Sequence, residues 1–457
     1  MLTSCSKETE PRASSTYLGG QIINPVSSRV TIKKDNKLID TVSLDRNNFF
    51  LYEFKELEPG LYEFFHNERQ LVYLTEGDSL LLRLNTLEFD ESLTFSGYGA
   101  DRNNLLMDLF LHNEKENGII MALYQRDPLA FEAALDSLRQ SREVIWQRYR
   151  TRNETTKDFQ KVAEAMLSFD NYARKEYYPI SHFGQDHATL LRQLPDDFYS
   201  FREKVDFNDG DLATLYSYQR YLIAFLNHQA FLSYVDQNSA YQPNALEHNI
   251  HKLKTIDEKI VNSTLRNYLL RFTTRNFLAR SNDPQESAQI YNLFMDFSTE
   301  VEDRAYMREV YETNKRLDAG QLLPEEQVVS AKDDQAQLTK LVHNKPTVFY
   351  FWSTDRLKHL KLVHLRVNEL REKFPEYEYI GLNIDGEAQI WKDIIRRHGF
   401  DASKEYRFNN SDHAKEELVI NTVNKSIIVD AKGKILNSHA NILSQDFENE
   451  LLQYLNN

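Results

Sequence analysis

The chain has 457 residues, more than one hydrophobic core usually holds, and at roughly 100–200 residues per domain this length indicates about three domains. With 41% hydrophobic and 27% charged residues, the composition is that of a globular protein and excludes a disordered or membrane-spanning chain. The formal net charge of -14 argues against nucleic acid as a partner, because nucleic-acid binding depends on clustered Lys and Arg that displace counterions from phosphates.

Cys5 is the only cysteine in the sequence, so the chain can form neither an internal disulfide nor a cysteine-based zinc cluster. The segment Leu2–Cys5 resembles a bacterial lipobox, in which a signal peptidase cuts before the cysteine and its thiol carries a lipid. A signal peptide also needs an apolar stretch of about 7–15 residues, so this interpretation expects an upstream start. The alternative is a chance cysteine near the start of a cytosolic protein.

Residues 6–15 are polar and show no hydrophobic periodicity, as expected of a flexible tether between a membrane and a folded domain. We therefore assign residues 1–16 to a lipobox and tether, and predict membrane attachment through a lipid on Cys5. The resemblance to such lipoproteins implies the outer membrane, because Ser6 rather than Asp follows the cysteine. The acidic Glu8 and Glu10 leave both the periplasmic and the cell-surface side open.

Residues 17–101 predict an antiparallel β-sandwich. Short runs of alternating apolar and polar residues are separated by turns such as Glu58–Gly60 and Glu76–Ser79, where Gly and Pro suit chain reversal. The predicted strands are Arg29–Ile32, Leu38–Val42, Phe49–Tyr52, Leu61–Phe64, Leu71–Leu74 and Leu80–Leu84. Through its turns at Leu57–Tyr62 and Gly77–Ser79, the segment resembles a small β-domain of unknown function that precedes thioredoxin domains in envelope lipoproteins.

Residues 102–330 predict an all-α domain. Only 14 glycines against 25 Tyr and 27 Phe favour long helices packed through aromatic side chains. Apolar residues recur at helical spacing between Phe131 and Tyr149, between Ile256 and Phe272, and between Ile290 and Phe297. Asp283–Pro284 predicts the start of the last of these helices. We interpret the aromatic stripes as core.

Residues 331–457 predict a layered α/β domain, because short apolar strands alternate with amphipathic helices. Pro346–Trp352 is typical of a buried central strand. The elements expected after it are a helix from Leu357 to Phe374, a strand Tyr379–Asp385, a helix Ile390–Arg397, a strand Ser426–Asp430, a turn Ala431–Lys434, a strand Ile435–Leu436 and a helix Phe447–Leu455.

This last segment resembles the TlpA-type family, thioredoxin-like reductases anchored at bacterial membranes. Lys345–Trp352 is similar to the family's strand that ends in the Trp before the active-site motif. Ile428–Ile435 is similar to its terminal hairpin, and the expected strand and helix lie between. The resemblance implies a thioredoxin-like fold for the domain.

The family's redox chemistry needs Cys-x-x-Cys at a helix start, where the first thiol has a lowered pKa. Ser353–Arg356 occupies that place here, and a serine hydroxyl is no reversible redox centre. The resemblance also implies a cis-proline just before the terminal hairpin, where this sequence has Val423–Lys425. Because cis bonds are costly without proline, we expect a trans bond at Asn424. The sequence therefore predicts a redox-inactive protein that is no enzyme and uses no cofactor.

The vacated active-site face is a candidate interface. We expect it to combine the turn after the first strand with the loop before the terminal hairpin. Trp352 would anchor the contact, since aromatic rings often dominate interface energies. The other residues of this candidate face are Ser353, Asp355 and Arg356 on one side and Val423 and Asn424 on the other. The alternative is that Trp352 packs only within its own domain or against the helical segment.

The histidines do not predict a metal site. His248 and His251 could share one helix face, but no third ligand has a suitable spacing. We interpret them as exposed residues, and expect surface or cap positions for His182, His187, His359 and His364. No carboxylate pair, phosphate-binding glycine loop or Gly-x-Ser-x-Gly motif indicates another chemistry.

Three functions remain open. The first is a non-catalytic, lipid-anchored accessory subunit of an outer-membrane assembly, whose partners are other outer-membrane or envelope proteins. The second is an enzyme or chaperone related to thiol-disulfide oxidoreductases, or a hydrolase with its site in the helical domain. The third is a lipoprotein that binds a peptide or a glycan.

Overall fold

The computed structural model describes residues 15–456, apart from residues 26, 67, 183–186, 236–241, 282, 355, 386–387 and 421. Cys5 and Asp355 therefore lie outside the described residues. The chain divides into two compact units. Unit 1 is Met1–Pro243 with Lys254–Leu269, and unit 2 is Asn244–Leu253 with Leu270–Asn457. Whether the predicted segments 17–101, 102–330 and 331–457 fold independently stays a prediction.

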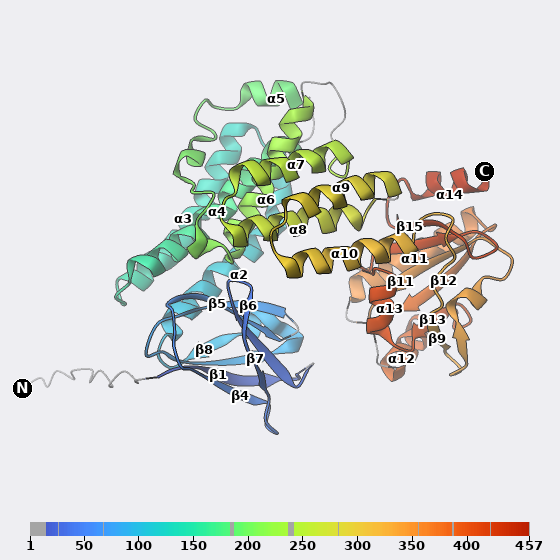
Figure 1. The fold of residues 1–457 in the computed structure, drawn as a ribbon, viewed down its shortest axis with the longest axis horizontal. Coiled ribbons are helices and arrows are strands. Elements are labelled where there is room, and N and C mark those ends of the chain that lie inside the picture. The colour runs from blue at the N-terminus through green and yellow to red at the C-terminus, as the bar shows by residue number, and fades with distance from the viewer. Residues whose placement is uncertain are drawn as a thin grey trace, which may run out of the picture. The chain divides into compact units, whose positions relative to one another are not determined.

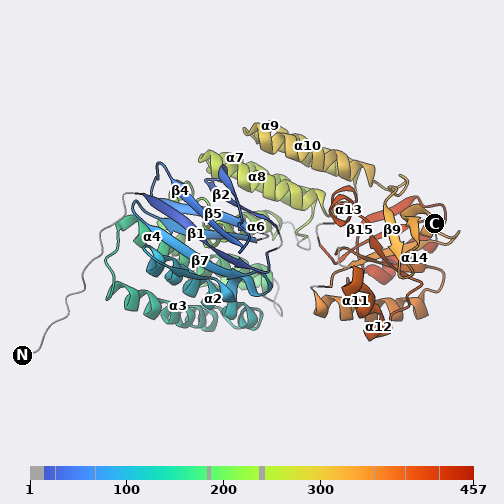
Figure 2. The same cartoon turned by 90° about the horizontal axis from the view of Figure 1, so that it is seen from below.

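Unit 1 begins with two β-sheets that enclose an apolar core (Figures 1 and 2). One sheet has the order β4-β1-β7-β8 and the other β3-β2-β5-β6. The strands are β1 (Thr16–Ile23), β2 (Arg29–Lys34), β3 (Lys37–Ser43), β4 (Phe49–Phe54), β5 (Gly60–His66), β6 (Glu68–Leu74), β7 (Ser79–Asn85) and β8 (Thr94–Ser96). The predicted strands are present, but β1 pairs with β7 in parallel, so the sandwich is not wholly antiparallel as predicted. Alternation in a sequence identifies a strand and does not specify its neighbour.

Helices follow the sandwich in unit 1. They are α1 (Phe89–Ser92), α2 (Ala100–Leu123), α3 (Pro128–Arg150), α4 (Lys157–Ser181), α5 (His187–Gln193) and α6 (Tyr216–Val235). Asp127 caps α3 by accepting from the Ala130 amide, with Pro128 in the first turn. Phe131 and Trp146 of the predicted stripe are buried. The stripe is therefore core, as predicted.

Sandwich and helices of unit 1 are joined by polar contacts to β6. Asn103 of α2 clasps the backbone of Tyr73, accepting from its amide at 2.7 Å and donating to its carbonyl at 3.0 Å. Arg69 places its guanidinium 4.3 Å from the ring centroid of Tyr216. These contacts satisfy a buried stretch of backbone and a partly exposed charged group where the helices meet the sandwich.

Helices α7 (Leu246–Lys259) and α8 (Ser263–Leu278) each contribute residues to both units. Unit 2 continues with α9 (Pro284–Phe297) and α10 (Val301–Arg316). Asp283 caps α9 by accepting from the Gln285 and Glu286 amides, which confirms the predicted start. No described helix has the length and apolar character needed to cross a membrane.

The rest of unit 2 is one mixed sheet with the order β10-β9-β13-β12-β11-β14-β15. The strands are β9 (Gln327–Ser330), β10 (Gln335–Gln337), β11 (Thr347–Trp352), β12 (Glu378–Asn383), β13 (Glu405–Phe408), β14 (Lys425–Val429) and β15 (Ile435–Asn441). Strands β11, β12 and β13 are parallel to one another. Strand β14 is antiparallel to both of its neighbours, β11 and β15. The predicted alternation of strands and helices in the α/β domain is confirmed.

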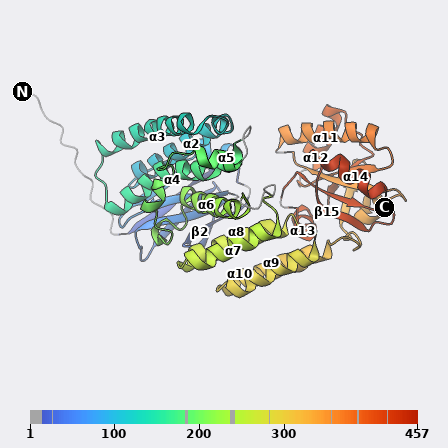
Figure 3. The same cartoon turned by 90° about the horizontal axis from the view of Figure 1, so that it is seen from above.

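Helices cover both faces of this sheet (Figure 3). One apolar core joins the sheet to α11 (Leu357–Lys373), α12 (Ala388–His398) and α14 (Phe447–Leu455). A second core, on the opposite face, includes α13 (Ser411–Glu417). The carboxyl end of β11 and the start of β14 remain at one edge of the layers, where the candidate site lies.

Candidate functional site

The candidate face forms where β11 ends and β14 begins. Tyr350 pairs with Ser426 in the antiparallel ladder of these two strands. The chain that leaves β11 and the chain that enters β14 therefore meet at one edge of the sheet. This pairing brings Ser353 and Arg356 to the same end of the sheet as Asn424.

The described residues of this face differ in exposure. Arg356 and Asn424 are exposed, whereas Ser353 is 5% exposed and Val423 is 6% exposed. The hydroxyl of the neighbouring Thr354 donates to Asp385 Oδ2 at 2.9 Å, which fixes this side chain within the domain. Only Arg356 and Asn424 among the described residues of the predicted face thus offer their side chains to a partner.

The helix start lies beyond the predicted motif. Arg356 is the N-cap residue of α11, whose first helical residue is Leu357. A four-residue motif that begins at the helix start would therefore span Arg356 to His359, instead of the predicted Ser353–Arg356. This is a correction of position only, since neither Arg nor His supplies a thiol. A helix start is hard to place from sequence where no side-chain cap marks it, and Arg356 makes no capping bond.

Trp352 is fully buried in its own domain, with 0% of its surface exposed. Its Nε1 donates to Glu405 Oε2 at 2.8 Å, and its ring meets the His364 ring edge-on at 5.4 Å. The prediction that Trp352 anchors a surface contact is therefore wrong, and the alternative of packing within its own domain holds. The physical reason is the buried carboxylate, which gives the indole N–H a partner in the interior.

Glu405 is the centre of a buried polar cluster beneath the candidate face. It is 1% exposed and accepts from Tyr350 Oη at 2.6 Å in addition to Trp352. His364 Nε2 lies 3.3 Å from its Oε1, and His364 Nδ1 donates to the Leu360 carbonyl at 2.7 Å. Burial, followed by the Glu405 charge, raises the pKa of Tyr350 well above its ordinary value. The phenol therefore stays protonated and donates.

Several histidines predicted to lie on the surface are buried. His182, His248 and His364 are at most 6% exposed, and His187 and His359 are half-buried. His364 stacks on Phe400 with 3.6 Å between ring centroids. The surface prediction was wrong for His248 and His364, because an imidazole ring can pack its apolar body among buried side chains. His182 is the C-cap residue of α4, which is one of the two kinds of position predicted for it. No three His, Cys, Asp or Glu side chains of the described residues come together as metal ligands would.

A polar pocket of about 560 Å³ opens beside Asn424 in unit 2. One wall is the end of α8, with Arg275 and Asn276, and the turn after it, with Arg280. The other lining residues come from the loop before β14, from the start of β14 and from the end of β15. They are Thr422, Asn424, Lys425, His439 and Asn441. We call this space the α8 pocket.

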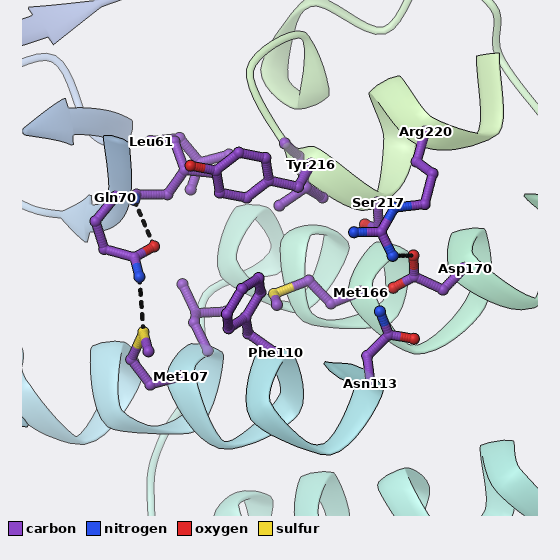
Figure 4. Close-up of a pocket in the computed structure, with 13 residues that line it drawn as sticks. Leu61, Gln70, Met107, Phe110, Asn113, Met166, Asp170, Tyr216, Ser217 and Arg220 are labelled. Carbon is purple, nitrogen blue, oxygen red and sulfur yellow. Dashed lines mark hydrogen bonds and ion pairs between the residues drawn. The ribbon is translucent and has the colours of Figure 1, made fainter. Parts of the chain in front are cut away.

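A second hollow, in unit 1, is much smaller (Figure 4). It has a volume of about 30 Å³. Strands β5 and β6 line it on one side, and helices α2, α4 and α6 line it on the other. Gln70 donates to Met107 Sδ at 3.2 Å on one side, and Arg220 donates to Asp170 Oδ1 at 2.8 Å on the other. A space of this size is far below that of ordinary small-molecule sites, so we place no ligand there.

Comparison with known proteins adds to this geometry. No family model matches the sequence, and no curated protein matches it. The thioredoxin domain of a thiol-disulfide oxidoreductase from Bacteroides vulgatus is 19% identical, with a TM-score of 0.25 over 30% of this chain and 98% of that one. A thiol-disulfide oxidoreductase from Bacteroides fragilis is 18% identical, with a TM-score of 0.25 over 30% of this chain and 99% of that one.

A thioredoxin-like protein from Porphyromonas gingivalis is 22% identical, with a TM-score of 0.25 over 29% of this chain and 89% of that one. These similar structures are thiol-disulfide oxidoreductases and thioredoxin-like proteins.

Sequence reasoning missed Glu405 and the residues of the α8 pocket other than Asn424. One signal for Glu405 was present, namely Gly381 inside an apolar strand, since a glycine there often marks a close approach by another group. The pocket gave no signal. Its residues are separated by more than a hundred positions and share no motif.

Proposed function

We propose that this chain works by binding a partner and carries out no thiol-disulfide exchange. The observation that carries the proposal is the chemistry of the α11 start, where Arg356 and His359 stand at the helix N-cap and first turn. Thiol exchange needs a thiolate, and the chain's one cysteine, Cys5, belongs to the predicted lipobox. The face keeps an exposed Arg356 and Asn424, which suit a polar contact with a partner protein.

We further propose that the partner is another outer-membrane or envelope protein. In this proposal Cys5 carries a lipid, residues 6–15 form the tether, and the folded units act as an accessory subunit of an outer-membrane assembly. The basis is the lipobox resemblance of Leu2–Cys5 together with the polar composition of the tether.

An insulin-reduction assay tests the first half of the proposal. The purified chain, supplied with dithiothreitol at a concentration that alone reduces insulin slowly, should not accelerate the reaction. Acceleration that persists in Cys5→Ala would support an oxidoreductase function that does not depend on a thiol of this chain. Acceleration lost in Cys5→Ala would assign thiol chemistry to Cys5. Either result contradicts the proposal.

Capture from detergent-solubilised envelope membranes tests the face. Arg356→Glu combined with Asn424→Arg should remove the co-purifying partner, because it reverses one charge and adds bulk and charge at the second position. The matched control is Arg396→Glu with Asn368→Arg, which makes the same changes at exposed positions of α12 and α11. Equal capture by both double variants would show that any partner contact lies elsewhere.

A further inference from the structure

The α8 pocket has a cationic wall. Arg275 and Asn276 line it from the last turn of α8, and Arg280 lines it from the turn that follows the helix. Arg280 Nη1 donates to Asn244 Oδ1 at 3.2 Å, which holds this guanidinium at the pocket rim. Two guanidinium groups on one wall can bind a carboxylate or a phosphate group through paired N–H donors.

Lys425 supplies a third cation from the opposite wall. It is 9% exposed, and its Nζ donates to the carbonyls of Leu418 at 2.7 Å and Val419 at 3.0 Å. An ammonium group has three N–H donors, so these two bonds fix its direction and leave one for a ligand. A buried ammonium is costly unless its charge is compensated, and an anion in the pocket would compensate it.

The other lining groups restrict the class of anion. Among the described residues, no Asp or Glu and no Phe, Tyr or Trp lines the pocket. The positive charges of Arg275, Arg280 and Lys425 disfavour a cation, and none of the described lining residues offers an aromatic ring on which a nucleobase could stack. The amides of Asn276, Asn424 and Asn441 both donate and accept, as the hydroxyls of a sugar require.

We propose that the α8 pocket binds a hydroxylated anion, namely a sugar acid or a sugar phosphate. The guanidinium groups of Arg275 and Arg280 hold the charged group, and the amides of Asn424 and Asn441 bind hydroxyls. A volume of about 560 Å³ falls within the size range of small-molecule sites. This inference rests on the proposed function in that the chain works by binding. The two claims are tested by different experiments. Thiol turnover in the insulin assay would contradict the proposed function, whereas only the titration with sugars decides whether the pocket binds an anion.

Isothermal titration of the full chain tests the inference. The probes are glucuronate, galacturonate and glucose 6-phosphate, with glucose and galactose as neutral controls. At least one charged sugar should bind with saturation at or below about 1 mM, and the neutral sugars should bind at least tenfold more weakly. Whether the carboxylate or the phosphate probe binds identifies the source of the charge.

The decisive variant is Arg275→Gln with Arg280→Gln, which keeps hydrogen-bonding side chains and removes both charges. It should weaken binding of the charged sugar by about a hundredfold, as expected for losing two charge-assisted hydrogen bonds. Arg396→Gln with Arg397→Gln removes the same charge from exposed positions of α12 and should bind like wild type. Thermal unfolding confirms that both variants fold.

Three results would overturn the inference. The first is no binding of any charged probe up to about 10 mM, roughly tenfold above the expected limit. The others are equal binding of charged and neutral sugars, and unchanged affinity in the folded Arg275→Gln, Arg280→Gln variant.

Discussion

The carboxylate of Glu405 occupies the space that any side chain at position 381 would need. A Cβ atom at Gly381 would lie 2.2 Å from Glu405 Oε2, closer than real Cβ contacts come. The two residues face each other across neighbouring strands, since Gly381 of β12 pairs with Glu405 of β13. The buried cluster beneath the candidate face therefore depends on a glycine in the next strand.

Gly381→Ala should destabilise unit 2 by about 3 kcal/mol, because the added methyl group displaces the carboxylate from Tyr350 and Trp352. Urea unfolding followed by tryptophan fluorescence in a Trp146→Phe background measures this, since Trp352 and Trp391 then report on unit 2 alone. Gly118→Ala is the control. It lies exposed in α2 of unit 1, where an added Cβ would meet no atom within 4 Å, and it should leave the unfolding transition of unit 2 unchanged.

Gly381→Ala on a Glu405→Ala background separates the clash with the Glu405 carboxylate from backbone strain. With the carboxyl group gone, Gly381→Ala should cost much less than in wild type, a coupling expected for residues in contact. An equal cost on both backgrounds would mean that Glu405 is not what excludes a side chain at position 381.

Glu116→Ala should destabilise the helices of unit 1 by about 3–5 kcal/mol, because it leaves two buried cations without their anion. Glu116 pairs with Arg142, which is 0% exposed, and with Arg174 at 2.5 Å. Hydrogen exchange of amides in α2, α3 and α4 measures the local loss. Glu114→Ala, two residues away in α2 and exposed, should change protection by no more than about 0.5 kcal/mol.

Binding of glucuronate to the α8 pocket should weaken as pH rises from 6 to 9. Burial lowers the pKa of Lys425 to about 7. Burial, followed by the Lys425 charge, lowers the pKa of His439 to about 3, and Arg275 and Arg280 stay charged. Among the described lining residues, Lys425 is thus the group that titrates in this range.

The direction of the change in affinity follows from the charge on Lys425. Below pH 7 the ammonium form is present and attracts the carboxylate, and above pH 7 the proton is lost, so affinity falls by up to about tenfold per pH unit. Titration calorimetry at several pH values measures the slope. Lys425→Met should bind more weakly at pH 6 and show a flat profile. A wild-type profile as flat as that of Lys425→Met would contradict the assignment.

Cys5→Ala should release the protein from membranes, if a lipid on this residue is the anchor. Expressed with a complete signal sequence, wild type should fractionate with the outer membrane and the variant with the soluble fraction. Ser6→Ala is the control and should not change the total bound to membranes. Equal partition of wild type and Cys5→Ala would remove the lipoprotein proposal.

The sequence by itself determined the local elements and the chemistry that the chain lacks. Asp283–Pro284 marked the start of α9 because capping is a local interaction, and Pro346–Trp352 marked β11 because a continuous apolar run in a short segment must be buried. The one cysteine excluded a thiol pair before any fold was known.

Only the tertiary structure decided which side chains meet. Tyr350 and Glu405 are 55 residues apart in sequence and share one hydrogen bond, and the α8 pocket joins Arg275 to Asn441. Trp352 looked like a surface anchor because it directly precedes the predicted open face, while its buried partner Glu405 lies 53 residues away in sequence. Such long-range pairs depend on strand order and helix packing, to which each residue's own neighbours in sequence contribute no signal.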